Sequence, residues 1–251
     1  MPTMSELVEF LDEELKISEI PDYPGAYNGL QIQNEGVVSK VGAAVDASLP
    51  VIKKAVAQGV DFLLVHHGMF WQGVRPIKGA EYQKIKLAID SGLAIYSAHI
   101  PLDIHPVYGN NVLLSKALGL GEGEAFFPWK GIDLGRKSYF QGNLRELMDL
   151  VRTAVGGDIV LRGESSDPAG QVGIITGGAG SEVEAMSETG IQTFITGEGP
   201  HWSHPLAEEL GLNVIYAGHY ATETFGVRAL SMYLDEKFGL DSTFIDHPSG
   251  L

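Results

Sequence analysis

Histidine and carboxylate side chains follow several apolar runs of this sequence, and together they could do metal chemistry. The residues concerned are His66, His67, His99, Asp103, His219 and Glu223. Imidazole nitrogens and carboxylate oxygens are ligands for Zn, Mn, Fe, Ni or Co. The chain has no cysteine, so disulfides, thiolate zinc sites and cysteine nucleophiles are excluded. Any metal must therefore be bound through nitrogen and oxygen.

The histidine pair His66 and His67 comes directly after the apolar run 60–65. Open α/β sheets present ligands and catalytic groups at the carboxyl ends of their strands. Because adjacent side chains on a strand point to opposite faces, the two rings converge only if the backbone turns, and Gly68 permits a turn. A surface or capping role is the simpler alternative for this pair.

His99 and Asp103 follow the strand-like run 93–96. Pro101 lies between them and disfavours a regular helix, so we expect both residues in a loop. Ordinary hydrogen bonds at a strand end are the alternative role for this pair.

His219 and Glu223 follow the run 214–217, with Gly218 freeing the backbone before the histidine. If a helix begins near His219 and continues through 227–234, the i, i+4 spacing places both side chains on one face. A capping acid beside a histidine with satisfied hydrogen bonds is the alternative.

The three motifs together favour a metal site over these separate alternatives, since the carboxyl ends of parallel strands meet at one edge of a sheet. Two metals about 3.5 to 4 Å apart, bridged by carboxylate and water, could activate that water. The water could then attack a phosphoryl group, a carbonyl or a ring carbon.

The elements that must position these motifs form a repeated pattern. Segment 41–46 is strand-like, 49–58 is helix-like and 60–65 is strand-like, which predicts a parallel crossover. The same pattern recurs without a gap from Val172, at an offset of 131 residues. We interpret this as internal duplication, although glycines recur in such turns and similarity between two βα units can arise by chance.

A second pair of segments extends the repeat. GLAIYSAHIPLD from Gly92 resembles GLNVIYAGHYATE from Gly211 with one inserted residue, and each copy ends in histidine, three residues and a carboxylate. The repeat predicts an α/β fold with two similar, intertwined lobes and mixed sheets.

We expect residues 1–251 to form a single compact unit. Within it, the predicted first lobe spans about 1–125 together with 212–251, and the second spans about 126–211.

Composition narrows the classes of function. The chain has 251 residues, of which 44% are hydrophobic, enough for a sizeable core. Its net charge of −15 repels polyphosphate backbones, so non-specific nucleic-acid binding is not expected. The N-terminus has no apolar run of signal-peptide length, and no stretch approaches the roughly 18 apolar residues of a membrane span. We expect a cytoplasmic protein that does not engage the membrane.

Sequence signatures of other kinds of functional site are weak or absent. The glycine-rich stretch 177–181 follows a strand-like run but lacks both the GxxxxGK[ST] and the GxGxxG pattern, so a tight turn is favoured over a phosphate-binding loop. No GxSxG nucleophile elbow is present.

Several motifs in combination resemble the Nif-three-like dinuclear metal centre proteins, the family of GTP cyclohydrolase I type 2 homologues. The motifs are YNGLQI, FLLVHHGMFW, SAHIPLD with GNN following, FITGE, AGHYATETFGVRAL and FIDHP. The resemblance covers nearly the whole chain. It implies a two-lobed α/β fold and assembly into toroidal homohexamers with metal sites facing inward.

The resemblance also implies two divalent metal ions per chain. The ligands it implies are His66, His67, Asp103, His219 and Glu223. His99 matches a position near that site, as a metal or substrate contact.

The chain departs from the family at one position. Members of the family often have Asp-Asn before the Gly-Leu, whereas this chain has Tyr27-Asn28, so only Asn28 carries over. The repeat also aligns Glu198 with His67. We expect Glu198 to support a ligand or transfer a proton, the alternative being a solvated acid at a strand end.

Two classes of function remain open. The first is a metal-dependent hydrolase acting on a nucleotide-like or phosphorylated small-molecule substrate, with GTP cyclohydrolase activity as a narrower version. That version requires a pocket that recognises the guanine base, and no motif identifies one. The second is a non-catalytic, metal-stabilised hexameric assembly or regulatory protein.

Overall fold

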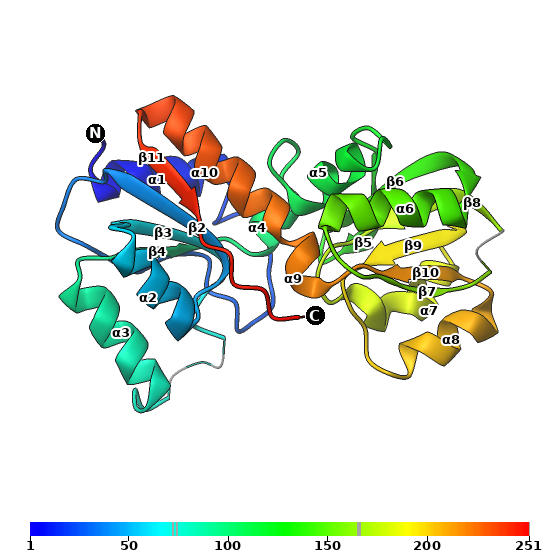
Figure 1. Cartoon of the computed structure of the whole chain (residues 1–251), viewed down its shortest axis with the longest axis horizontal. Coiled ribbons are helices and arrows are strands. Elements are labelled where there is room, and N and C mark those ends of the chain that lie inside the picture. The colour runs from blue at the N-terminus through cyan, green and yellow to red at the C-terminus, as the bar shows by residue number, and fades with distance from the viewer. Residues whose placement is uncertain (72, 74, 165–166, 251) are drawn as a thin grey trace. The chain divides into compact units, whose positions relative to one another are not determined.

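The computed structural model describes residues 1–71, 73, 75–164 and 167–250, which form two compact units (Figure 1). Unit 1 comprises Met1–Leu102 and Gly226–His247, and unit 2 comprises Asp103–Phe225 and Pro248–Leu251. These boundaries are not those of the two lobes drawn from the sequence, and the assignment of the whole chain to a single compact unit stays a prediction.

Unit 1 is built on a five-stranded sheet with the order β1-β4-β3-β2-β11. The strands are β1 (Gly29–Ile32), β2 (Lys40–Asp46), β3 (Phe62–His67), β4 (Ala94–Ser97) and β11 (Asp241–Phe244). Strands β11, β2, β3 and β4 run parallel, while β1 is antiparallel to β4. The carboxyl ends of β2, β3 and β4 therefore meet at one edge of this sheet, where the histidine motifs begin.

The helices of unit 1 pack on this sheet. They are α1 (Met4–Glu14), α2 (Leu49–Ala57), α3 (Ala80–Asp90), the start of α4 (Ile100–Asp103) and most of α10 (Thr224–Phe238). Ile52 and Ala55 of α2 share a fully buried cluster with Leu63, Val65 and Ile95 of the sheet. Removing one such aliphatic side chain costs about 2–5 kcal/mol, so this packing fixes the strand that carries the histidine pair.

Unit 2 is built on a six-stranded sheet with the order β5-β6-β8-β9-β10-β7. The strands are β5 (Glu124–Trp129), β6 (Ile132–Asn143), β7 (Val160–Arg162), β8 (Pro168–Ile174), β9 (Thr193–Thr196) and β10 (Asn213–Tyr216). Strands β8, β9 and β10 run parallel and the others pair antiparallel. The helices are α5 (Asn110–Ala117), α6 (Leu144–Val155), the 3-10 turn η1 (Ala179–Glu182), α7 (Val183–Ser187), α8 (Ser203–Leu210) and α9 (His219–Thr222).

Strand pairing in the two sheets agrees with the sequence repeat. Val41 lies opposite Phe62 in the first sheet and Val172 lies opposite Thr193 in the second, so both partners move by the same 131 residues. Each of these pairs has a third parallel strand beside it, β4 in unit 1 and β10 in unit 2, and an antiparallel strand follows, β1 or β7. The predicted fold class, α/β with two similar lobes and mixed sheets, is confirmed.

The loop predicted between His99 and Asp103 is wrong, because α4 begins at Ile100 and ends at Asp103. Pro101 is the second residue of this single turn. The first N–H groups of a helix have no partner within it, so a proline costs little there.

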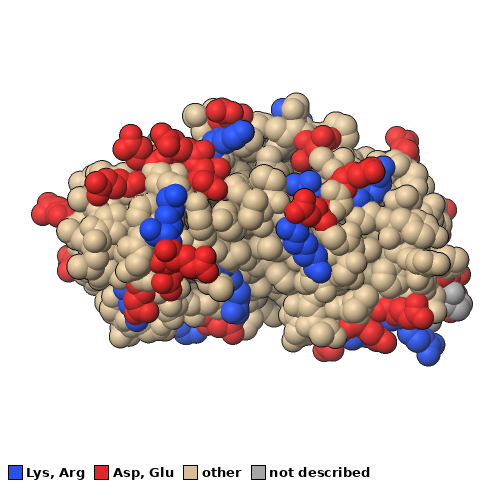
Figure 2. All heavy atoms as spheres, turned by 90° about the horizontal axis from the view of Figure 1, so that it is seen from above, with Lys and Arg blue, Asp and Glu red and all other residues tan. Residues whose placement is uncertain are grey.

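Among the charged side chains on the face drawn in Figure 2, acidic ones cover more of the surface than basic ones. This distribution accords with the net charge of −15. Within the part of the chain that the structure describes, no helix has both the length and the apolar character needed to cross a membrane.

Candidate metal site

Three histidines meet at the carboxyl edge of the unit 1 sheet. His66 and His67 end β3, and His99 follows β4. The ring centroids of His66 lie 4.9 Å from those of both other histidines, and His67 and His99 are 5.6 Å apart. Their candidate ligand nitrogens all lie within 4.8 Å of one another. The structure thus brings His99 into a cluster with the histidine pair.

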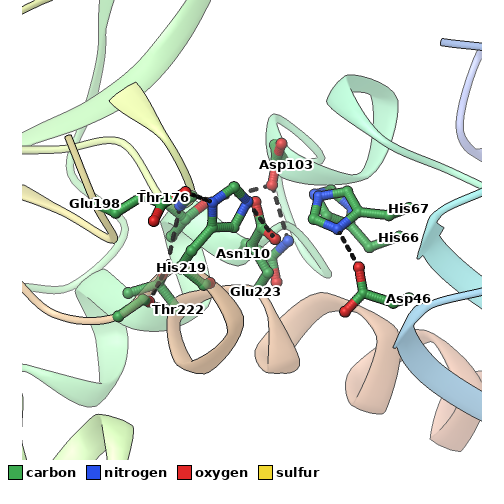
Figure 3. A network of polar contacts seen from close by, with 12 residues as sticks. Asp46, His66, His67, Asp103, Asn110, Thr176, Glu198, His219, Thr222 and Glu223 are labelled. Atoms are coloured by element: carbon green, nitrogen blue, oxygen red, sulfur yellow. Dashed lines mark hydrogen bonds and ion pairs between the residues drawn. The ribbon is translucent and has the colours of Figure 1, made fainter. Parts of the chain in front are cut away.

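Oxygen acceptors hold the Nδ1 atoms of the histidine pair. His66 Nδ1 lies 2.9 Å from the carbonyl oxygen of Ala98, and His67 Nδ1 lies 2.9 Å from Asp46 Oδ1, as Figure 3 shows for the latter. An acceptor at this position keeps the proton on Nδ1, which makes Nε2 the nitrogen with a lone pair for a metal. Both rings are therefore set in the tautomer that a metal ligand requires.

Asp22 plays the same part for His99. Its side chain is only 7% exposed, and its Oδ1 lies 2.9 Å from His99 Nδ1. The carboxylate also accepts hydrogen bonds from Asn28 Nδ2 at 2.8 Å, from the Ile100 N–H at 3.1 Å and from the Tyr23 N–H at 2.6 Å. Burial raises the pKa of Asp22, but the hydrogen bond and charge of His99 and the hydrogen bonds from Asn28 and the Tyr23 N–H lower it by more, so the net pKa lies below its usual value. The carboxylate is ionised at neutral pH and fixes the His99 ring.

The sequence did not point to Asp22. It is the only acid in the loop 21–28, which is the one signal that could have singled it out. Asn28, which carries over from the family pattern, accepts a hydrogen bond from the His99 N–H at 2.7 Å. The same loop thus supplies both the Asp22 carboxylate and the Asn28 amide to His99.

Gly68 matters for a reason other than the predicted turn. It is not among the glycines with positive φ. A Cβ at Gly68 would lie 2.1 Å from Gln31 Nε2, and Gln31 Oε1 accepts a hydrogen bond of 2.7 Å from the Met69 N–H. The glycine allows a side chain from β1 to pack against the backbone that follows the histidine pair.

In unit 2, His219 lies between two carboxylates, as Figure 3 shows. Its Nδ1 lies 2.7 Å from Glu198 Oε1 and its Nε2 lies 3.2 Å from Glu223 Oε2. Gly218, with φ of 91°, precedes it. The single helix predicted from this point is wrong, because α9 ends at Thr222 and α10 begins at Thr224. The i, i+4 pair meets nonetheless across that break.

These carboxylates determine the protonation of His219. Burial lowers its pKa, but the hydrogen bonds and charges of Glu223 and Glu198 raise it more, and the net pKa is about 9. In the metal-free protein His219 is therefore an imidazolium at neutral pH. A divalent ion binding to Nε2 has to displace that proton.

Asp103 belongs to a buried polar network in unit 2 (Figure 3). Its Oδ1 lies 2.8 Å from Asn110 Nδ2 and 3.3 Å from Thr176 Oγ1. Asn111 accepts a hydrogen bond of 2.8 Å from the Thr176 N–H and donates one of 3.2 Å to the carbonyl oxygen of Asp103. The sequence contained the two asparagines within a family motif but gave no reason to pair them with Thr176.

Gly177 makes room for Glu223. A Cβ at this position would lie 2.1 Å from Glu223 Oε1, and its φ of 71° also disfavours any other residue. The Gly177 N–H donates a hydrogen bond of 3.0 Å to Thr222 Oγ1. In this glycine-rich stretch, the first glycine thus lets a carboxylate approach the backbone, and η1 follows at once.

The two units therefore carry His and Glu clusters whose donor sets suit a divalent cation. Unit 1 offers three imidazoles, and unit 2 offers the His219 imidazole beside the buried carboxylate of Glu223. Nitrogen and oxygen donors of this kind fit Zn, Mn, Fe, Ni or Co.

Comparisons with known proteins extend over the full chain. A family model described as Duf34/NIF3 (NGG1p interacting factor 3) matches residues 2–249. A relative from Pyrococcus abyssi (strain GE5 / Orsay), named GTP cyclohydrolase 1 type 2 homolog, is 42% identical over 249 residues, covering 98% of each chain. A relative of the same name from Deinococcus radiodurans is 39% identical, covering 98% of this chain and 94% of its own. The solved structure of protein ybgI, described as of unknown function, is similar with a TM-score of 0.89 at 34% identity, covering 99% of this chain and 100% of that one.

Proposed function

The chain belongs to the Duf34/NIF3 family, and from that premise we propose that it binds two divalent metal ions and acts as a metal-dependent hydrolase. Its substrate in this proposal is a nucleotide-like or phosphorylated small molecule. The family resemblance implies the number of metals, and the local geometry in each unit supports the choice of ligands.

One observation carries the proposal: an oxygen atom lies within hydrogen-bond distance of Nδ1 in all four candidate histidines. The partners are Ala98 O for His66, Asp46 for His67, Asp22 for His99 and Glu198 for His219. Histidines that bind metals almost always donate their other N–H to such an acceptor. A packing or capping role would not require the same arrangement four times.

The proposed ligands are imidazole and carboxylate side chains. They are His66, His67, Asp103, His219 and Glu223. His99 offers a further imidazole beside the pair in unit 1, as a metal ligand or as a contact to substrate. Five N/O ligands are more than one open catalytic ion uses and enough to hold two ions that share a carboxylate.

Divalent ions held by these residues would supply Lewis acidity and would activate water at neutral pH. Asp22 and Asp46 keep the proton on Nδ1 of their histidines and so hold each ring in place. Glu198, whose side chain is 42% exposed, shares the Nδ1 proton of His219 and can pass a proton to solvent. Asn110 and Thr176 orient the carboxylate of Asp103 by hydrogen bonds to one oxygen.

The test combines elemental analysis of protein purified without chelator with a turnover screen over nucleotides and phosphate esters. Two ions per chain and turnover that a chelator abolishes are the expected results. At most one ion at full occupancy would contradict the dinuclear centre. Two ions without turnover on any substrate would favour a metal-stabilised assembly or regulatory protein. GTP belongs in the screen because the relatives carry the name GTP cyclohydrolase 1 type 2 homolog.

We also propose a homohexamer, on the family resemblance alone. Light scattering at micromolar concentration should report six chains. A stable monomer would remove the assembly proposal and leave the metal proposal standing.

A further inference from the structure

An aromatic cavity of about 410 Å³ lies beside the histidine cluster, within unit 1. Its apolar lining comes from two loops and consists of Pro24, Tyr27, Met69, Phe70, Trp71 and Ile77. Pockets for small molecules commonly have about 300–1,000 Å³ and a mainly apolar and aromatic lining. The cavity is therefore of a size and character suited to a small organic ligand.

The walls of this cavity are joined to each other by hydrogen bonds. Gln31 donates to the carbonyl oxygen of Tyr27 at 2.8 Å and accepts from the Met69 N–H at 2.7 Å, so a single side chain ties both loops together. A Cβ at Gly25 would lie 2.0 Å from the Trp71 carbonyl oxygen, so the loops touch backbone to backbone. Contacts between the two loops therefore fix the shape of the cavity.

Two aromatic rings of the cavity are exposed. Tyr27 is 57% exposed and Phe70 is 37% exposed, and their ring centroids lie 6.4 Å apart with the planes at 82°. Exposed apolar groups that gather in a concave site commonly mark a ligand site. An edge-to-face pair of this kind offers one ring face and one ring edge to a flat molecule.

Trp71 connects the cavity to the histidines. Its indole N–H donates to the Gly68 carbonyl oxygen at 2.8 Å, which fixes the ring. The ring lies edge-on to His99, with centroids 5.0 Å apart at 87°, and to His67, with centroids 5.8 Å apart at 72°. A ligand stacked in the cavity would place its substituent toward the histidine cluster.

The charges of the cavity favour a neutral ring over a phosphate. Arg75 forms an ion pair with Glu81, and both residues line the cavity, so their charges offset one another. The protein as a whole has a net charge of −15, which disfavours a phosphate away from a bound cation.

We propose that this cavity binds a planar heteroaromatic ring of purine size and thereby makes the substrate a nucleotide rather than a simple phosphate ester. That the ligand is a substrate rests on the proposed hydrolase function. Binding of the ring itself does not depend on metal. It supplies the base-binding pocket that the sequence motifs do not identify.

The test is calorimetric titration of chelator-treated protein with guanosine and adenosine, with ribose 5-phosphate as the comparison. Saturable binding of at least one nucleoside, and none of ribose 5-phosphate at the same concentrations, is expected. Tyr27→Ala should weaken nucleoside binding by about five- to a hundredfold, the usual range for loss of one stacking ring. Tyr139→Ala is the matched control, because Tyr139 is 65% exposed in unit 2.

Fluorescence gives a second readout that a general loss of stability would not imitate. Nucleoside should quench Trp71, so Trp71→Phe should lose most of the quenching while Trp202→Phe, at a tryptophan that is 50% exposed elsewhere, should keep it. Phe70→Leu preserves the apolar surface and removes the ring, so weaker binding in that variant assigns the effect to stacking.

Three results would overturn the inference. They are absence of nucleoside binding at millimolar concentration, equal binding by the Tyr27→Ala variant and its parent, and competition by ribose 5-phosphate. If Tyr27→Ala instead dissociates the assembly in light scattering, the cavity is covered by a second copy of the chain and the inference is wrong. Failure of the hydrolase proposal looks different, because nucleoside would still bind metal-free protein while the turnover screen stayed negative.

Discussion

Replacing Asp22 by Asn should separate the positioning of His99 from the folding of unit 1. The substitution keeps the shape of the side chain and removes its charge. Asp22 accepts hydrogen bonds from Asn28, Ile100 and Tyr23 in addition to its contact with His99. An amide has one acceptor oxygen for these donors, and its NH2 group would face hydrogen-bond donors in place of a carboxylate oxygen.

Two magnitudes follow. A hydrogen bond to a charged group contributes about 1.5–3 kcal/mol, so the free energy of unfolding should fall by about 2 kcal/mol. If His99 is a metal ligand rather than a substrate contact, loss of the acceptor that orients it should weaken metal binding by about 10- to 100-fold. The weaker binding should follow from the freed His99 ring, which no longer keeps its proton on Nδ1.

The assay is titration of chelator-treated protein with Co²⁺, followed by visible absorption, together with urea unfolding. Asp61→Asn is the matched control. Asp61 also accepts several hydrogen bonds, from the Ser39 N–H and hydroxyl and from the Lys40 N–H, but it precedes β3 at the end opposite the histidines. This control should lose stability and keep its metal affinity. If Asp22→Asn, like the control, loses only stability and keeps the Co²⁺ affinity and spectrum of the parent, Asp22 does not position a metal ligand and the reasoning fails.

Three further predictions concern unit 2. Glu223→Gln should lose one metal or bind it at least about tenfold more weakly in isothermal titration, because the charge that offsets the cations is removed. Two metals bound as tightly as in the parent would show that Glu223 is not a ligand. The pKa of His219 is raised from 6.5 to about 9, so its contribution to the stability of metal-free protein should be complete below pH 6.5 and lost as pH rises through about 9. Metal affinity should increase over the same range, because the proton on the ring no longer competes with the metal. Thermal unfolding and metal titration from pH 6 to 10 check both trends, and pH-independent results would contradict them. Gly177→Ala should reduce stability by more than about 1 kcal/mol and also weaken metal binding, because its Cβ would collide with Glu223. The control Gly190→Ala has a similar φ of 77° and open space around it, so it should lose stability only. Equal metal affinity in the two variants would show that the approach of Glu223 to Gly177 does not affect metal binding.

The sequence by itself determined the strands of the repeated pattern and the repeat itself. Apolar runs such as 60–65 and the ungapped match of Val41 with Val172 depend on local pattern, and the two sheets reproduce that offset in their strand registers. Residue type at the strand ends also singled out the histidines, because a parallel sheet gathers those ends at one edge. These inferences needed only chain order and periodicity.

Helix boundaries near the histidine and carboxylate motifs were harder to predict from the sequence. A proline at Pro101 reads as a helix breaker, yet in the first turn of α4 its missing N–H has no helical partner to lose. The helix predicted from His219 stops after one turn and restarts at Thr224. Such details depend on the hydrogen bonds that the surrounding fold offers to each backbone group.

Apart from Glu198, which the repeat singled out, the partners of the candidate ligands were decided by tertiary structure. Asp22 meets His99 across 77 residues of sequence, and Thr176 meets Asp103 across 73. No periodicity links such residues, because a hydrogen bond between distant segments depends on where loops cross, and loops follow from the packing of both sheets. The sequence therefore supplies the donor and acceptor groups, and folding determines which of them come within hydrogen-bond distance of one another.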